Sequence, residues 1–193
     1  MQKLAILDYY ADDGEQAPQR YRYIGIDKNI GELSQVKFLD GDAVIDDELE
    51  IFTVKKRSHE LPSTNKRLLI KKASGYERDS FNHEHFLVVR EDSKTVLLSG
   101  CAHNGILSIL DAYIEKYGKA PDVVVSGFHL MNKKGYSEED MEEVKDIAYQ
   151  LMEYPTKFYT CHCTGVEPYE VMKEIMGDKL EYVHSGDEVR LDW

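Results

Sequence analysis

Three histidines in the second half of the chain each lie beside a glycine, directly after a predicted strand. His103, His129 and His162 belong to the segments SGCAHNG, SGFHL and TCHCTG. In α/β sheets, ligands collect at the carboxyl ends of strands, where the following helices direct free N–H groups. Neutral imidazole is also the commonest metal ligand, although any single histidine is more often a hydrogen-bonded structural residue. We therefore predict that the three histidines meet at one metal site.

The three cysteines of the chain, Cys101, Cys161 and Cys163, lie in two of these segments. If the segment around His162 is extended, both of its sulfurs point away from the histidine, so that these three side chains do not bind one metal together. The absence of a CxxC pair argues against a zinc ribbon or a thioredoxin-like site. A helix N-terminus lowers thiol pKa values, which leaves a nucleophilic cysteine as an alternative. We expect small, buried side chains near the site.

Alternating strands and helices must position these residues. Helical spacing of apolar residues follows Gly105, a β-branched run fills 123–125, and Ser137 with Asp140 resembles a capping box. From residue 85 the pattern predicts the order β-β-α-β-α-β-α-β-β and a mixed sheet with flanking helices. The expected elements are a hairpin over 86–98, helices over 106–117, 141–151 and 168–176, strands over 122–126 and 157–161, and a terminal hairpin that pairs 180–183 with 188–191.

The first 80 residues carry weaker signals. Residues 1–41 are weakly defined, and we expect two short helices there, the second near 29–35. Alternation from Val44 predicts a strand. Residues 55–80 hold eight Lys or Arg side chains with little apolar periodicity, which predicts a long loop. Its basic groups are either solvated or local cations for a phosphate or carboxylate.

Composition limits the classes of function. The chain has 193 residues, 42% hydrophobic and 31% charged, which is typical of one globular domain. Its net charge of −12 argues against nucleic acid and anionic membranes as partners. No apolar run reaches membrane-spanning length and no signal peptide begins the chain, which predicts a cytoplasmic protein. The odd number of cysteines fits a reducing compartment.

The segments GCAHNGI, SGFHL and HCTG, in this order and with Glu84 ahead of the first hairpin, resemble the closing half of the metallo-β-lactamase-fold hydrolases. The most similar subgroup is that of the dihydropterin-ribofuranosylaminobenzene-phosphate synthases, and the resemblance covers residues 20–193. It implies an α/β fold, an incomplete αββα sandwich with 1–193 as a single domain. It also implies one or two metal ions, usually zinc, whose bound water attacks a small-molecule substrate.

The resemblance also implies roles for individual residues. His103 and His162 correspond to metal ligands. His129, Cys101, Cys163 and Glu84 correspond to cleft residues without an assigned role. In many relatives an aspartate that bridges two metals stands at the position of Cys101, so we do not expect the usual dinuclear site.

The HxHxDH motif, which supplies most metal ligands in this family, occurs nowhere in the sequence. Two histidines alone do not hold a catalytic metal, which takes three or more protein ligands and a water. We therefore expect the C-terminal part of the fold, a truncated form with impaired catalysis, and zinc or another divalent metal that is weakly bound or absent. The alternatives are a non-enzymatic binding or assembly module and an α/β protein with an unrelated thiol or phosphate site.

The resemblance also bears on assembly. In the related fold two sheets pack face to face, so a chain that lacks most of one sheet leaves apolar strands uncovered. Uncovered strands and edges favour association with another chain. We expect a two-fold homodimer or higher even oligomer, or a complementing N-terminal half.

Overall fold

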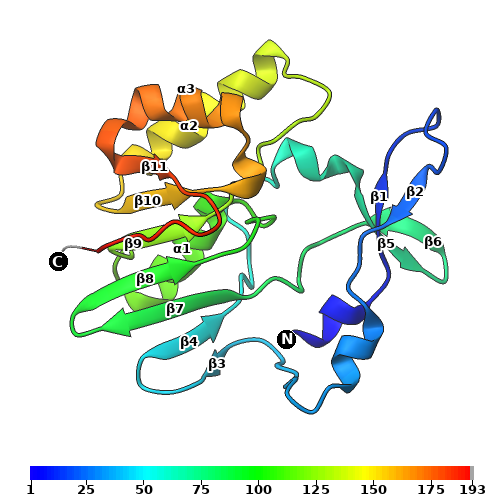
Figure 1. Cartoon of the computed structure of the whole chain (residues 1–193), viewed down its shortest axis with the longest axis horizontal. Coiled ribbons are helices and arrows are strands. Elements are labelled where there is room, and N and C mark those ends of the chain that lie inside the picture. Colours follow the sequence, from blue (N-terminus) through cyan, green and yellow to red (C-terminus); the bar gives the residue numbers. More distant parts are fainter. Residues whose placement is uncertain (192–193) are drawn as a thin grey trace.

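The computed structural model describes residues 1–191, which form two β-sheets and three α-helices (Figure 1). The larger, seven-stranded sheet has the order β11-β10-β9-β8-β7-β4-β3, and the smaller has the order β2-β1-β5-β6. The strands are β1 (Tyr9–Asp12), β2 (Tyr21–Tyr23), β3 (Ala43–Val44), β4 (Leu49–Phe52), β5 (Leu68–Lys72), β6 (Gly75–Arg78), β7 (Phe86–Glu91), β8 (Lys94–Leu98), β9 (Val123–Ser126), β10 (Lys157–Thr160) and β11 (Leu180–Tyr182). The α-helices are α1 (Ile106–Tyr117), α2 (Glu138–Met152) and α3 (Val166–Met176). Short 3-10 helices are η1 (Lys3–Ile6), η2 (Lys28–Glu32), η3 (Ser63–Arg67), η4 (His162–Thr164) and η5 (Gly177–Lys179).

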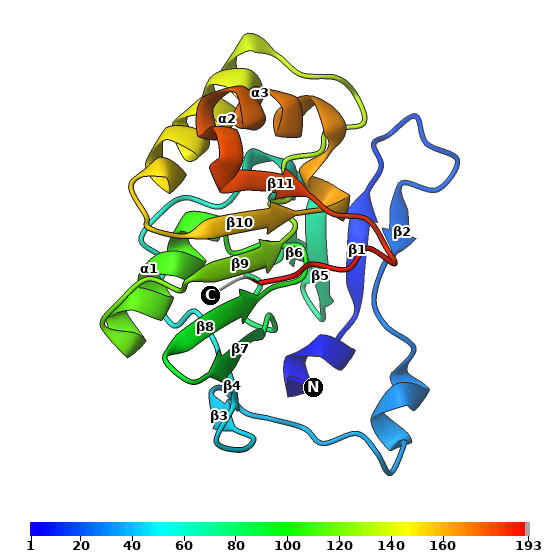
Figure 2. The ribbon, with the colours of Figure 1, turned by 60° about the vertical axis from the view of Figure 1, so that its left-hand side comes forward.

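The larger sheet is mixed, as predicted. Strands β8, β9, β10 and β11 pair in parallel, whereas β3, β4, β7 and β8 pair antiparallel. Each parallel pair is joined by one helix, and successive right-handed crossovers in one direction place all three helices on the same face. Figure 2 shows α1, α2 and α3 together on that side.

The core lies between this helical layer and the larger sheet. Leu97, Val124 and Phe158 from three adjacent strands are fully buried there, with Ile109 and Tyr113 from α1. Helix α2 begins with the predicted capping box, in which Ser137 and Asp140 exchange hydrogen bonds. The capping box of α2 and the apolar stripe of each helix therefore fix the helical layer.

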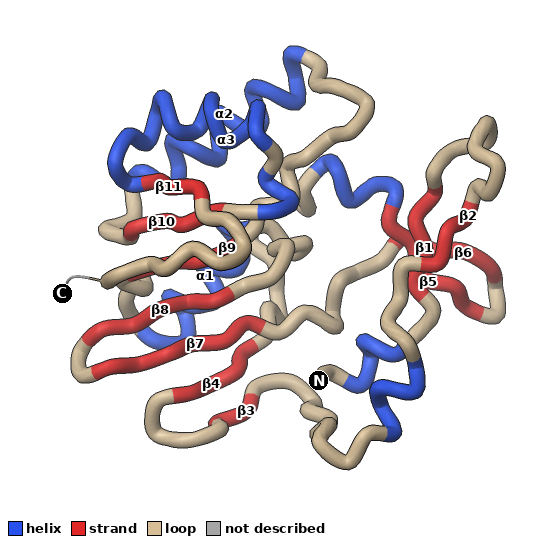
Figure 3. Tube along the Cα trace, in the orientation of Figure 1, coloured by secondary structure: helices blue, strands red, loops and turns tan. Residues whose placement is uncertain are grey.

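The opposite face of the larger sheet is apolar and only half-buried. One cross-strand row joins Val89 and Val96, and the next joins Leu87, Leu98 and Val125. Figures 1 and 2 show the segment after β11 crossing this face, while the smaller sheet stands at its end (Figures 1 and 3). None of these five side chains belongs to the core under the helices. We call this surface the open face.

The element order predicted for residues 86–182 is confirmed, and the rest needs three corrections. The predicted loop over 55–80 contains η3 and the β5–β6 hairpin, whose partner β1 is far away in the sequence. Residues 1–41 form β1 and β2 besides η1 and η2. The terminal hairpin is wrong, because β11 pairs in parallel with β10 and residues 188–191 form no strand. Among the described helices, none has the length and apolar character needed to cross a membrane.

A leucine-to-alanine substitution should lower the free energy of unfolding by different amounts on the two faces of β8. Leu97→Ala removes a fully buried side chain and should lower the free energy of unfolding by about 2–5 kcal/mol. In the monomer, Leu98→Ala on the open face should cost less than about 1.5 kcal/mol, because water reaches that side chain when no second copy covers it. Urea unfolding of both variants measures the difference. Equal losses would show that the open face is covered in solution.

Candidate metal centre

Three loops meet at the carboxyl ends of the parallel strands β8, β9 and β10. Backbone hydrogen bonds join them: the Gly127 N–H donates to the Gly100 carbonyl at 2.9 Å, and the Met131 N–H donates to the Cys163 carbonyl at 2.9 Å. The Phe128 N–H also donates to the Thr164 hydroxyl at 2.8 Å. The strand order thus brings together segments that are about 30 residues apart in the chain.

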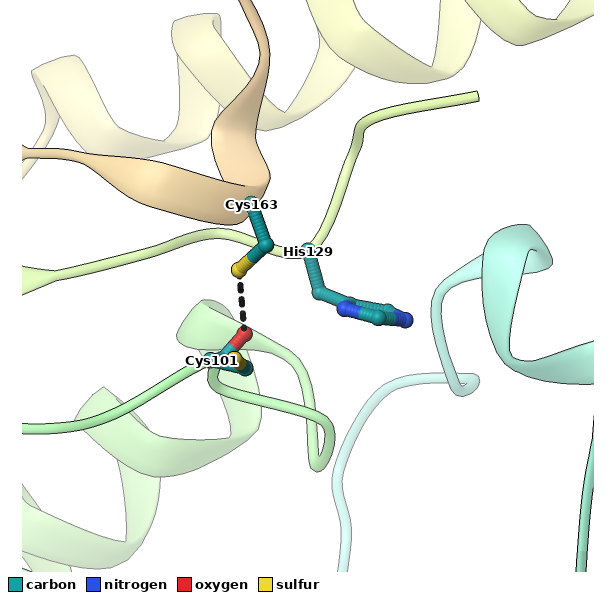
Figure 4. Close-up of side chains that lie close together, drawn as sticks. All are labelled: Cys101, His129 and Cys163. Carbon is teal, nitrogen blue, oxygen red and sulfur yellow. Dashed lines mark hydrogen bonds between the residues drawn. The ribbon is translucent and has the colours of Figure 1, made fainter. Parts of the chain in front are cut away.

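Cys101, His129 and Cys163 lie side by side on these loops, and the Cys163 sulfur points toward Cys101 (Figure 4). Their ligand atoms lie within 4.8 Å of one another. The Cys163 thiol is buried and donates to the Cys101 carbonyl at 3.5 Å, whereas Nδ1 of His129 is buried without a hydrogen-bond partner in the structure. Two sulfurs and an unsatisfied imidazole nitrogen are donors that suit a transition-metal ion. The residues therefore fit a bound metal.

The backbone around this cluster adopts conformations that are uncommon for L-residues. Ala102, His129 and His162 have φ angles of 54°, 52° and 49°, one in each loop. A Cβ atom on Gly127 would lie 2.6 Å from the Cys163 sulfur, so only glycine permits this approach. Such strain persists where the surrounding structure enforces it and gathers at functional sites.

His103 lies next to the cluster, and Asn65 orients it. The Asn65 side-chain amide donates to the His103 carbonyl at 2.7 Å, so its Oδ1 is the atom that faces His103 Nδ1 at 2.9 Å. Nδ1 therefore carries the ring proton, and Nε2 keeps a lone pair. The His103 ring also stacks on Phe81, with 4.8 Å between ring centroids, and lies 4.0 Å from the His129 ring.

Glu84 anchors the loop that carries Cys101 and His103. Its carboxylate accepts hydrogen bonds from the His103 N–H at 2.7 Å, the Asn104 N–H at 2.8 Å and the Asn104 side-chain amide at 2.7 Å. These three donors occupy the carboxylate. Glu84 thus has a positioning role in this structure.

His162 is exposed on η4, while its neighbour Cys163 turns inward. The half-buried Cys161 is not one of the three residues whose ligand atoms converge, although burial and the charge of Cys101 raise the pKa of its thiol. The structure therefore brings together His103, His129, Cys101 and Cys163, with Glu84 behind them, and places the side chain of His162 outside. The sequence analysis missed Asn65, which lies in the segment predicted to be a loop and carries no motif.

The two clustered thiols differ in protonation. The Cys163 thiol is the largest influence on Cys101 and, by hydrogen bonding, lowers the pKa of Cys101 to about 2. Hydrogen bonding to Cys101, together with burial, raises the pKa of Cys163. Burial lowers the pKa of His129, so its ring is neutral at pH 7. The cluster thus offers a thiolate, a thiol and a neutral imidazole, each suited to a metal ion once the Cys163 proton leaves.

A cavity of about 510 Å³ opens beside His129 and Cys163. Its walls come from the smaller sheet, η3 and the loop after His129. The cationic groups among its lining residues are Arg22, Lys66, Arg67, Lys133 and Lys134, and the carboxylates are Asp12, Asp13 and Asp140. Arg22 and Arg67 both pair with Asp13, at 2.8 Å and 2.5 Å. The lysines remain as positive charges in a chain of net charge −12.

The fold is similar to that of a solved structure, Tm1679, described as a metal-dependent hydrolase of the β-lactamase superfamily. The similarity has a TM-score of 0.79 and 24% sequence identity, and it covers 98% of this chain and 69% of that one. The chain has the β-lactamase-superfamily fold. This confirms the fold class that the resemblance implied.

A sequence comparison agrees with the predicted subgroup. The chain is 27% identical over 110 residues to the 7,8-dihydropterin-6-methyl-4-(β-D-ribofuranosyl)-aminobenzene-5'-phosphate synthase of Methanocaldococcus jannaschii. The match covers 56% of this chain and 35% of that protein, so the aligned part spans about a third of the relative. No protein-family model matches the chain.

Glu84→Ala should loosen the loop that carries Cys101 and His103. The substitution leaves three donors without their acceptor, and we expect the free energy of unfolding to fall by about 2–4 kcal/mol. Glu91→Ala, on the exposed end of β7, is the control and should change it by less than about 0.5 kcal/mol. Chemical unfolding of both variants provides the comparison. Similar small losses would contradict the anchoring role.

Proposed function

We propose that this chain is a metal-dependent hydrolase of the β-lactamase superfamily that acts as one domain and has low turnover by itself. The observation that carries the proposal is the convergence of Cys101, His103, His129 and Cys163 at the carboxyl ends of β8–β10 in this fold. Zinc or another divalent ion would supply an activated water when bound there. The three free cysteines fit a reducing compartment such as the cytoplasm.

The chain's own residues have distinct roles in this proposal. The thiols and the His129 ring would hold the cation, and the His103 ring, whose centroid lies 4.0 Å from that of His129, would be a further donor or a proton acceptor. Asn65 fixes the tautomer of His103, and Glu84 fixes its backbone. The low turnover follows from the missing HxHxDH motif, since positioning and metal activation of the water provide most of the rate.

The cavity beside the cluster favours an anionic small molecule as substrate. Lys66, Lys133 and Lys134 supply positive charge there, and the negative surface elsewhere disfavours nucleic acid. The name of the curated relative contains a 5'-phosphate. We infer a small substrate that carries a phosphate or carboxylate group.

Slow, zinc-dependent hydrolysis of bis(p-nitrophenyl) phosphate is the expected activity. The turnover should lie below the ~1–10³ s⁻¹ that is typical of enzymes, because the chain lacks the main ligand motif. His103→Ala should abolish the activity, whereas His184→Ala, an exposed histidine near the C-terminus, should retain it. Typical turnover would contradict the impaired catalysis. Release of p-nitrophenol only at the zinc-independent background would overturn the hydrolase.

A non-enzymatic binding or assembly module is the second candidate, and the open face favours it. Apolar side chains are also exposed in the N-terminal region, among them Leu33, Val44 and Ile45 at 53%, 74% and 54%. A stable interface buries roughly 800 Å² on each partner. We propose that the open faces of two copies pack together in a two-fold homodimer, with a complementing N-terminal half of the fold as the other occupant of this face.

Light scattering after size exclusion should give about twice the chain mass of 22.3 kDa at micromolar concentration. Leu98→Glu places a charge on the open face and should produce the monomer. Tyr149→Glu, at an exposed position on α2, is the control and should leave the dimer intact. A wild-type monomer, or a dimer that Leu98→Glu leaves intact, would rule out this interface.

A further inference from the structure

We propose that Cys101, His129 and Cys163 are three protein ligands of a thiophilic divalent cation, Zn²⁺ above all, with the fourth position open to His103 or water. The inference rests on the metal binding in the proposed function and specifies which residues bind and which metal they select. The resemblance to the hydrolase family assigns neither sulfur this role. This set of three ligands does not include His162, which the resemblance implies as a metal ligand.

The distances between the donor atoms suit one ion. Tetrahedral zinc with Zn–S near 2.3 Å and Zn–N near 2.0–2.1 Å needs donor atoms about 3.5–3.8 Å apart. The ligand atoms of the three residues already lie within 4.8 Å of one another. Backbone hydrogen bonds between the three loops hold the Cα positions of the donors in place. Small rotations of the side chains are therefore enough to bring the donor atoms to these distances.

The donor chemistry selects the metal. Thiolate sulfur and imidazole nitrogen favour Zn²⁺, whereas Mg²⁺ and Ca²⁺ require oxygen ligands. The cluster contains no carboxylate among the described residues, since the oxygens of Glu84 accept three hydrogen bonds in the adjacent loop. Three protein ligands with an open fourth position are also the usual composition of a catalytic zinc site.

The surroundings of His129 and Cys163 support a bound cation. Nδ1 of His129 is buried without a hydrogen-bond partner, although buried polar atoms are normally satisfied. Cys163 is 5% exposed, and its sulfur contacts the backbone only because residue 127 is a glycine. Both side chains line the cavity of about 510 Å³, through which an ion and a substrate reach them.

Co²⁺ titration of the metal-free, phosphine-reduced full chain tests the sulfur ligands. We expect a near-ultraviolet thiolate-to-cobalt charge-transfer band that saturates at one equivalent and is displaced by Zn²⁺ but not by excess Mg²⁺. Cys101→Ser and Cys163→Ser should each remove about half of the band, since each removes one of two sulfurs. Cys161→Ser is the matched control, and its band should equal that of the wild type. Circular dichroism verifies that each variant is folded.

Competition for Zn²⁺ with a chelating dye tests the nitrogen ligand. His129→Ala should weaken zinc binding at least about tenfold, whereas His162→Ala, at an exposed position on η4 outside the cluster, should leave it unchanged. Absence of the charge-transfer band in the wild type would overturn the proposal, as would its full retention in both Cys101→Ser and Cys163→Ser. Weaker binding in His162→Ala alone would favour the ligand pair that the resemblance implies.

The outcomes separate this inference from the proposed function. Thiolate-dependent metal binding without zinc-dependent hydrolysis supports the site and overturns the hydrolase. Hydrolysis that depends on zinc but survives in the serine variants overturns the sulfur ligands and leaves the hydrolase standing.

Discussion

Parallel pairing of β8, β9 and β10 is the constraint on which the rest of the structure depends. Parallel neighbours require crossover connections, and right-handed crossovers place α1, α2 and α3 on one face. The same pairing aligns the carboxyl ends of the three strands, so that their loops meet and exchange backbone hydrogen bonds. The buried core and the cluster of Cys101, His129 and Cys163 are thus two results of one topology.

Helices cover only one face of the larger sheet that this topology builds. Apolar side chains under the helices are fully buried, whereas those on the open face keep contact with water. The smaller sheet and η3 stand at the end of the larger sheet, where η3 supplies Asn65 to His103 and the cavity forms beside the cluster. The chain therefore joins a well-formed site to an apolar surface that suits a partner. The combination of a candidate site and an open apolar face is the reason why we propose a hydrolase with low turnover and, as the second candidate, an assembly module.

Local sequence signals predicted the elements from β7 to β11, because apolar periodicity, the Ser137 capping box and β-branched strands act within a few residues. They failed for β1 and β5, which pair with each other although they are far apart in the chain. They also failed for the local β5–β6 hairpin, whose sequence lacks clear apolar alternation. The sequence placed three histidines at strand ends correctly. It did not decide whether His162 or Cys163 faces inward, because that depends on the 3-10 turn of η4 and on the space that Gly127 leaves.

The central claim is that the loops after β8, β9 and β10 assemble sulfur and nitrogen donors for one metal ion. X-ray absorption at the zinc edge of the zinc-loaded chain measures those donors directly. The account predicts two sulfur neighbours near 2.3 Å and nitrogen or oxygen neighbours near 2.0–2.1 Å. A first coordination sphere that contains only nitrogen and oxygen would contradict it.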